Sequence, residues 1–143
     1  MNDTTTIWQF QESIPSDPNR GVEVILSLIN RLEKNSWPSR DVFGVHMAME
    51  EAVMNAIKHG NQRDPQKLVH IEIELTTNNM YAKVTDEGPG FDPEEVPDPT
   101  LDENLEKTSG RGLMLMRNYV DEVVYNDVGN SVELKKCRKL EQA

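Results

Sequence analysis

The sequence predicts an α+β fold in which helices pack on one face of a sheet built largely from hairpins. Two observations lead to this prediction. Residues 18–59 hold two segments in which apolar residues recur at helical spacing, and later segments alternate apolar and polar residues around short turns at 78–79 and 128–130. A chain of 143 residues has room for one substantial core, so we expect a single domain over residues 1–143.

The first strand and the first helix lie in the N-terminal part of the chain. Segment 5–14 alternates apolar and polar residues, which is typical of a strand. Asp17 can cap the helix that follows, with Pro18 in its first turn. The apolar residues of this helix are Val22, Val24, Ile25, Leu28, Ile29 and Leu32.

A second helix is predicted over residues 40–59. Ser39 can cap its start, and Gly60 can end it. Its apolar stripe consists of Val45, Met49, Ala52, Val53, Ala56 and Ile57. The small residues among these allow the helix to lie close to the sheet.

Polar residues line one edge of this stripe. Glu51 and Asn55 are four residues apart, so their side chains are neighbours on a helix, and Lys58 lies on the same side. Two interpretations remain open from the residues alone. They are a surface pair beside an ordinary core helix, or a half-covered polar site.

Two hairpins complete the predicted sheet. Segments 68–75 and 80–86 flank an Asn-Asn turn, and segments 121–127 and 131–140 flank a Val-Gly-Asn turn. The first hairpin runs into "VTDEGPGF" (84–91). A turn would explain the glycines there, but it would not explain an aspartate at the end of a buried strand.

Between the two hairpins the sequence predicts a mobile loop and a third helix. Residues 92–109 are acidic and hold three prolines. "SGRGL" (109–113) then opens the helix, where bare backbone N–H groups and the helix dipole favour anions. The alternative interpretation of this Gly-x-Gly is a hinge that closes the acidic loop.

The composition bounds the function. The net charge of −10 argues against nucleic acid as a partner, because phosphate backbones need a basic surface. No apolar run approaches the ~20 residues that span a bilayer, and the N-terminus lacks a signal-peptide pattern. The one cysteine, Cys137, leaves no intrachain disulfide and no cysteine-based zinc site. We therefore expect a cytoplasmic protein with no membrane partner.

The ordered motifs "EEAVMNAIKHGN", "VTDEGPGFDP" and "GRGLMLMRNYVDEVVY", with "IPSDPNR" before them, resemble the GHKL ATPase superfamily over essentially the whole chain. Within it, the sequence is most similar to the stand-alone anti-sigma factor serine/threonine kinases. The resemblance implies a two-layer sandwich of helices on a mixed, mostly antiparallel sheet. ATP would lie between the helices and a flexible lid at about residues 92–109.

The resemblance also implies how adenine is held. Asp86 would accept a hydrogen bond from the exocyclic amine, and a carboxylate offers only acceptors. Gly88 and Gly90 would let the backbone approach the base closely. Ser131 lies where many relatives carry a threonine that helps to hold adenine, although a serine in a strand is usually only a strand residue.

At the phosphate end, the resemblance makes Asn55 the ligand of Mg²⁺, which suits an ion that keeps waters and phosphate oxygens as further ligands. Lys58 would neutralise phosphate charge. The phosphate-binding residues implied in the third motif are Gly110, Arg111, Gly112 and Leu113. Arg111 either helps there or points to solvent.

Glu51 matches the acid that orients and deprotonates the nucleophile. The first hypothesis is an ATP- and Mg²⁺-dependent serine/threonine kinase that phosphorylates a small anti-sigma factor antagonist-like protein. A sigma factor is a second candidate partner, and a homodimer is expected because relatives are often homodimers. The alternative is a non-catalytic, nucleotide-dependent binding module. Retention of Glu51 and Asn55 favours the kinase.

Overall fold

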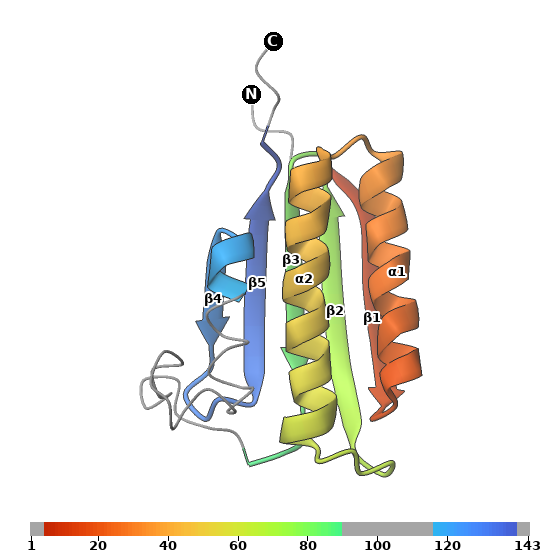
Figure 1. Cartoon of the computed structure of the whole chain (residues 1–143), viewed down its shortest axis with the longest axis vertical. Helices are drawn as coiled ribbons and strands as arrows, with labels where there is room; N and C mark the ends of the chain where they lie inside the picture. Colours follow the sequence, from red (N-terminus) through yellow and green to blue (C-terminus); the bar gives the residue numbers. More distant parts are fainter. Residues whose placement is uncertain (1–4, 90–115, 140–143) are drawn as a thin grey trace.

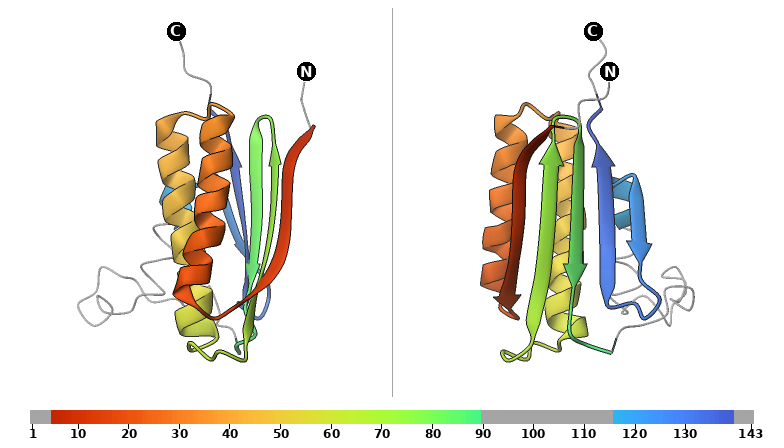
Figure 2. Two further views of the ribbon diagram at one scale, coloured as in Figure 1. Left: turned by 90° about the vertical axis from the view of Figure 1, so that its right-hand side faces the viewer. Right: turned by 180° about the vertical axis from the view of Figure 1, so that it is seen from behind.

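The computed structural model describes residues 5–89 and 116–139. Two long helices cover one face of a five-stranded sheet, with α1 towards one edge and α2 over its middle (Figure 1, Figure 2). The elements are β1 (Thr6–Pro15), α1 (Pro18–Lys34), α2 (Ser39–Asn55), η1 (Ala56–Gly60), β2 (Leu68–Thr76), β3 (Asn79–Thr85), β4 (Glu122–Tyr125) and β5 (Ser131–Cys137). The predicted α+β class and the two-layer arrangement are therefore confirmed.

The strands follow the order β1-β2-β3-β5-β4, and each of the four described pairings is antiparallel. Both predicted hairpins form, β2 with β3 and β4 with β5. Gly129 takes φ 77° in the second turn, a conformation that favours glycine. The pairing of β3 with β5 sets Thr85 opposite Ser131. The end of β3 that precedes Asp86 therefore lies beside the start of β5.

The core lies between the sheet and the two helices, as their apolar stripes predict. Its fully buried members include Leu28, Leu32, Val45, Met49, Val53, Ile57, Ile71, Leu75 and Leu134. The helices approach closely at Gly21, where an added Cβ atom would lie 2.8 Å from Cγ1 of Val53. None of the helices in residues 5–89 and 116–139 is long and apolar enough to cross a bilayer.

The first residues of α1 and α2 show which of the two predicted capping residues is correct. Asp17 caps α1 as expected, because its Oδ1 accepts a hydrogen bond of 2.9 Å from the backbone N–H of Asn19. The prediction that Ser39 caps α2 is wrong. Pro38 occupies the capping position, its carbonyl accepts from the N–H of Val42 at 3.0 Å, and no side chain caps this end. The helix therefore begins one residue earlier than predicted.

The end of the second helix also differs from the prediction of a regular helix over 40–59. The last residues form the π-helical turn η1, which closes with a hydrogen bond of 2.8 Å from the N–H of Asn61 to the carbonyl of Ala56. A π turn spans one residue more than an α turn and often occurs at functional sites. Here it carries Gly60 to the end of β3, against Asp86.

A buried ion pair ties the start of α2 to β5. Asp41 is 1% exposed and Lys136 is 8% exposed. The Lys136 ammonium lies 3.6 Å from Oδ1 of Asp41 and 3.9 Å from Oδ1 of Asp121. Oδ2 of Asp41 accepts a hydrogen bond of 2.8 Å from the backbone N–H of Lys139. Asp41 and Lys136 are buried while Asp121 is more exposed, and none of the three lines the pocket described below.

The remaining predicted elements are only partly described. Residues 116–119 are helical, which agrees with the end of the predicted third helix. The rest of that helix and the predicted loop at 92–109 lie outside the described residues.

Candidate functional site

A pocket of about 160 Å³ opens between the end of the second helix and the ends of β3, β4 and β5. This volume is many times the ~10–15 Å³ that one water molecule needs, so the pocket can admit part of an organic ligand. Its helical side consists of Ala52, Asn55, Ala56, His59 and Gly60. Its other side consists of Val84, Asp86, Pro89, Tyr125, Gly129, Asn130, Ser131 and Val132.

Three of the residues predicted from sequence meet in this pocket. Asn55, Asp86 and Ser131 come from α2, the end of β3 and the start of β5, and all three line it. Ser131 is buried, and its hydroxyl lies 2.8 Å from that of Thr85, its partner across β3 and β5. This hydroxyl pair would also form if Ser131 were only a structural residue of the sheet.

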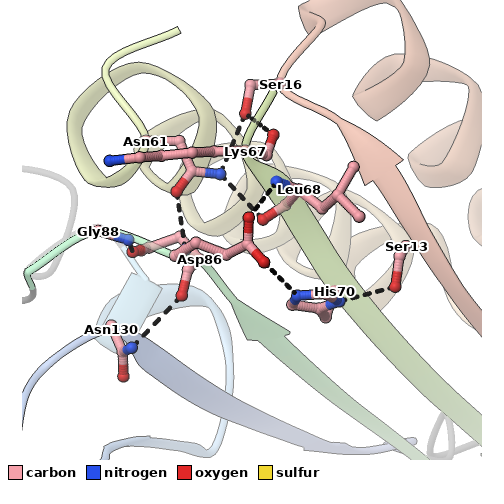
Figure 3. A network of polar contacts seen from close by, with 10 residues as sticks. Ser13, Ser16, Asn61, Lys67, Leu68, His70, Asp86, Gly88 and Asn130 are labelled. Carbon is pink, nitrogen blue, oxygen red and sulfur yellow. Dashed lines mark hydrogen bonds and ion pairs between the residues drawn. The ribbon is translucent and has the colours of Figure 1, made fainter. Parts of the chain in front are cut away.

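Asp86 is held at both its backbone and its side chain. Its N–H donates to the carbonyl of Asn130 at 2.9 Å, and Nδ2 of Asn130 donates to the Asp86 carbonyl at 3.3 Å (Figure 3). Oδ1 of Asp86 accepts from the N–H of Gly88 at 2.8 Å. A carboxylate has about four lone-pair sites, so this bond leaves it able to accept from a ligand.

The electrostatic setting of Asp86 is that of a half-buried acid. Burial raises the pKa of its carboxyl group, which the hydrogen bond from Gly88 and the charge of Lys67 offset only in part. A donor on a ligand that enters the pocket would favour the charged form. Asp86 is therefore suited to recognise an N–H group.

Two glycines are required beside this carboxylate. A Cβ atom at Gly60 would lie 2.3 Å from both Cγ and Oδ2 of Asp86, and one at Gly88 would lie 1.9 Å from the carbonyl oxygen of Gly60. At Gly88 the obstacle is backbone, so a side chain is excluded unless the backbone moves; at Gly60 an added Cβ would displace the Asp86 carboxylate. Gly88 thus lies next to the pocket wall, although it is not itself a lining residue.

Glu51 and Lys58 are placed differently from Asn55. Neither lines the pocket among the described residues; Glu51 is half-buried and Lys58 is exposed. Burial, followed by the charge of Glu50, raises the pKa of Glu51. Lys58 and His59 act in the opposite direction. Glu51 is thus partly withdrawn from solvent, whereas Lys58 remains solvated.

The structure adds pocket residues that the sequence analysis missed, His59 as a lining residue and Tyr125 among them. The pKa of Tyr125 is raised to about 12, chiefly by burial, against the charge of Arg117, which lowers it. The carboxylates of Asp86 and Glu51 contribute to this rise, so the Tyr125 phenol lies within electrostatic reach of both acids. The alternation of β4 could have assigned Tyr125 to a face, but only the pairing of β4 with β5 brings it to this pocket.

The residues described also limit how a metal could be held. No group of three or more His, Cys, Asp or Glu side chains in residues 5–89 and 116–139 could form a metal site by itself. A single amide oxygen from Asn55 fits an ion that takes its other ligands from phosphates and water, as Mg²⁺ does. The predicted residues Gly90, Gly110, Arg111, Gly112 and Leu113 lie outside the described residues.

Comparisons with known proteins agree with this arrangement. The sequence profile of the family described as "Histidine kinase-like ATPase domain" matches residues 14–136. The chain is 38% identical over 103 residues to "Anti-sigma F factor" of Geobacillus stearothermophilus. This alignment covers 66% of this chain and 70% of that protein. It is 30% identical over 110 residues to "Serine-protein kinase RsbW" of Staphylococcus aureus (strain MRSA252), which covers 71% of this chain and 69% of that protein.

A solved structure is similar in fold. It is the crystal structure of the RsbU and RsbW domains of a Mycobacterium tuberculosis protein, with a TM-score of 0.62 and 17% sequence identity. The match covers 95% of this chain and 33% of that one. At this identity the likeness supports the fold alone.

Proposed function

Because this chain belongs to the family of histidine kinase-like ATPase domains, we propose that it is an ATP-dependent serine/threonine protein kinase of the anti-sigma factor type. Its substrate would be a small antagonist protein in a partner-switching pathway. The names of the relatives, an anti-sigma F factor and a serine-protein kinase, support this proposal. The observation that carries it is the meeting of Asn55, Asp86 and Ser131 in one pocket.

The adenine base would occupy the end of the pocket at Asp86. Adenine presents an exocyclic amine, and the carboxylate can accept its hydrogen bond. The absence of side chains at Gly60 and Gly88 lets a flat ring lie against the backbone. The Ser131 hydroxyl, already paired with Thr85, would complete the contacts directly or through water.

The phosphates would lie towards Asn55 on α2. The Asn55 carbonyl oxygen would hold Mg²⁺, which when bound neutralises charge on the phosphate oxygens. Lys58, exposed on the following turn, would add positive charge. Phosphate contacts from Gly110, Arg111, Gly112 and Leu113, and a lid over residues 92–109, are further parts of the proposal.

Glu51 would act on the nucleophile. It lies one helical turn before Asn55 and has a raised pKa, and a base whose pKa lies nearer the working pH transfers protons more effectively. The hydroxyl proton of the substrate serine or threonine passes to a Glu51 oxygen. The hydroxyl oxygen bonds to the γ-phosphorus, and the bond from that phosphorus to the departing ADP oxygen breaks.

One observation favours the alternative of a non-catalytic, nucleotide-dependent binding module. Glu51 does not line the pocket among the described residues, so a role in positioning a partner segment would also suit it. The two functions differ in whether a phosphoryl group reaches the partner. A sigma factor as second partner, a homodimer and a cytoplasmic location are proposed on the resemblance to the relatives.

The test incubates the protein with Mg²⁺ and ATP labelled at the γ-phosphate, together with a panel of antagonist-like proteins from the same organism. The kinase proposal predicts label on a serine or threonine of one of them. Asp86→Asn is the matched variant, in which labelling should fall sharply. Transfer to no partner, with a partner affinity that differs between ATP and ADP, would instead establish the binding module.

A further inference from the structure

Asn61 is a polar residue with no solvent exposure. It follows directly after the π-helical turn, and its own N–H closes that turn onto Ala56. Its side chain forms three hydrogen bonds, two as donor and one as acceptor. A buried amide persists where such bonds compensate for lost water, so the surroundings of Asn61 are built around this side chain.

These three bonds join segments that are distant in sequence. Nδ2 of Asn61 donates to Oγ of Ser16 at 3.0 Å and to the carbonyl of Leu68 at 2.9 Å (Figure 3). Oδ1 of Asn61 accepts from the N–H of Glu87 at 2.7 Å. The amide thus connects the end of the second helix to the β1–α1 connection, to the start of β2 and to the residue after Asp86.

Glu87 is held a second time through its carboxylate. Oε1 accepts from the N–H of Leu68 at 2.7 Å, and Oε2 lies 3.3 Å from Nε2 of His70. The hydrogen bond from Leu68 is the largest of the effects that lower the pKa of Glu87. Nδ1 of His70 in turn lies 2.7 Å from Oγ of Ser13. Both the backbone and the side chain of Glu87 are therefore tied to the start of β2 and its surroundings.

Asp86 lies between two segments that hydrogen bonds hold in place. On one side, its backbone pairs with Asn130. On the other, Asn61 holds the backbone N–H of Glu87, while Leu68 and His70 hold its side chain. The carboxylate lies between these two attachments and packs against Gly60. Loss of the Asn61 acceptor would release the backbone after Asp86, so that only the Glu87 side chain and the Gly88 N–H would still restrain the direction of the carboxylate.

The backbone conformation of the two residues after Asn61 indicates that Asn61 is held in one position. Gln62 and Arg63 follow with φ of 52° and 58°. Such left-handed conformations are unfavourable for residues other than glycine and persist where the surroundings determine them. The bonds of Asn61 provide such a constraint.

We propose that Asn61 is a positioning residue for adenine recognition, which acts by accepting the Glu87 N–H and so fixes the direction of the Asp86 carboxylate. The inference rests on the proposed function, because it assigns Asp86 to the adenine amine. Asn61 would not touch the nucleotide. It would set how strongly the pocket distinguishes a base with a 6-amino group from one without it.

If Asn61 only stabilised the fold, its replacement would also lower stability, so a loss of stability cannot separate this role from the positioning role. The selectivity for the base can separate them. The probe is purine riboside triphosphate, which lacks the 6-amino group of ATP. The quantity is the ratio of its Kd to that of ATP, measured with Mg²⁺ on the full chain well below its unfolding temperature.

Wild type should prefer ATP by about 10-fold or more, the scale of one well-placed buried hydrogen bond. In Asn61→Leu, which removes the acceptor, the ratio should fall to within about twofold of one. Asn61→Asp keeps an acceptor at this position and should retain most of the preference. Ser16→Ala removes another partner of Asn61 without touching Glu87, and should lower stability but leave the ratio unchanged.

The outcomes separate the two claims. If wild type prefers ATP and Asn61→Leu keeps the full preference, the positioning role is refuted while the adenine site stands. If wild type shows no preference, Asp86 does not read the amine, and both claims fail. Should Asn61→Leu not fold, Asn61→Ala removes the same acceptor without adding bulk and gives the same readout.

Discussion

Gly60 lies directly against the carboxylate of Asp86, so that a Cβ atom at Gly60 would be 2.3 Å from Cγ of Asp86. The π-helical turn brings Gly60 to this position, and Gly88 closes on the carbonyl oxygen of Gly60 from the other side. The three residues form one packed unit at the end of the pocket. The direction of the carboxylate therefore depends on the absence of a side chain at both glycines.

Gly60→Ala should weaken ADP binding by about 10-fold or more, because the added methyl group would push the Asp86 carboxylate out of its position. Overpacking of this kind costs roughly 1–3 kcal/mol. Calorimetric titration with Mg-ADP measures the change. Gly44→Ala is the matched control, since its Cβ would lie 2.6 Å from the carbonyl oxygen of Tyr119 and away from the pocket. The control should lose stability and keep its ADP affinity. Equal affinities in wild type and Gly60→Ala would remove the packing argument.

Glu51→Ala should reduce the rate of phosphoryl transfer by about 10²–10⁴-fold, the usual contribution of a general base, with little change in nucleotide affinity. Glu51→Gln keeps the shape, and a smaller loss there would indicate that Glu51 orients the hydroxyl through a hydrogen bond. Single-turnover transfer to a partner's serine provides the rates.

The companion variant is Asn55→Ala. Asn55 lines the pocket, and we propose that it holds the metal, so its removal should lower Mg²⁺-dependent nucleotide affinity and activity together. Transfer at the wild-type rate by Glu51→Ala would mean that Glu51 is only a surface acid.

The Asp86 carboxylate should make the protein without nucleotide less stable at neutral pH than at pH 4. Its pKa in the folded state is raised above the ordinary value of 3.8, so between the two values the folded state binds more protons than the unfolded state. Stability from this group therefore falls as pH rises through that window. Asn does not titrate.

The free energy of unfolding of Asp86→Asn minus that of wild type should thus be more positive at pH 7 than at pH 4, because wild type loses stability from this group over this range and the variant does not. Urea unfolding of both proteins without nucleotide at the two pH values measures this difference. A relative stability of the variant that decreases from pH 4 to pH 7 would show that the folded state favours the charged carboxylate.

Asp41→Ala should destabilise the protein by up to about 3–5 kcal/mol, because it leaves the buried Lys136 ammonium with only the more exposed Asp121 carboxylate at 3.9 Å. Replacing both residues, as Asp41→Leu with Lys136→Met, should restore much of the loss. Chemical denaturation gives the free energies of unfolding. The nucleotide affinity of the folded variants should match wild type, since neither residue lines the pocket. An Asp41→Ala protein as stable as wild type would show that the pair contributes nothing.

The sequence predicts the hairpins and both long helices because each is encoded by local periodicity and turn residues. It also draws attention to Asp86, which follows a buried strand and precedes glycines, and Asp86 lies in the pocket. The π-helical turn is not predictable in this way, because Ala56–Gly60 has the composition of an ordinary helix end.

The network around Asn61 and the placement of Tyr125 escape prediction for a different reason. Asn61 contacts Ser16 across 45 residues of sequence. Tyr125 reaches the pocket only through the pairing of β4 with β5. Neither residue has a local signal, since each is defined by partners that only the folded chain brings together.

The central claim is that Asp86 recognises the amine of an adenine nucleotide, and calorimetry with Mg-ADP on wild type and Asp86→Asn tests it most directly. In the variant the amide oxygen would take over the bond from the Gly88 N–H that Oδ1 now accepts, which leaves its NH₂ group facing the adenine amine. We predict one-site binding by wild type and a loss of about 1–3 kcal/mol in the variant, or roughly 5- to 150-fold in Kd. No binding by wild type, or equal affinity in the two proteins, would contradict the account.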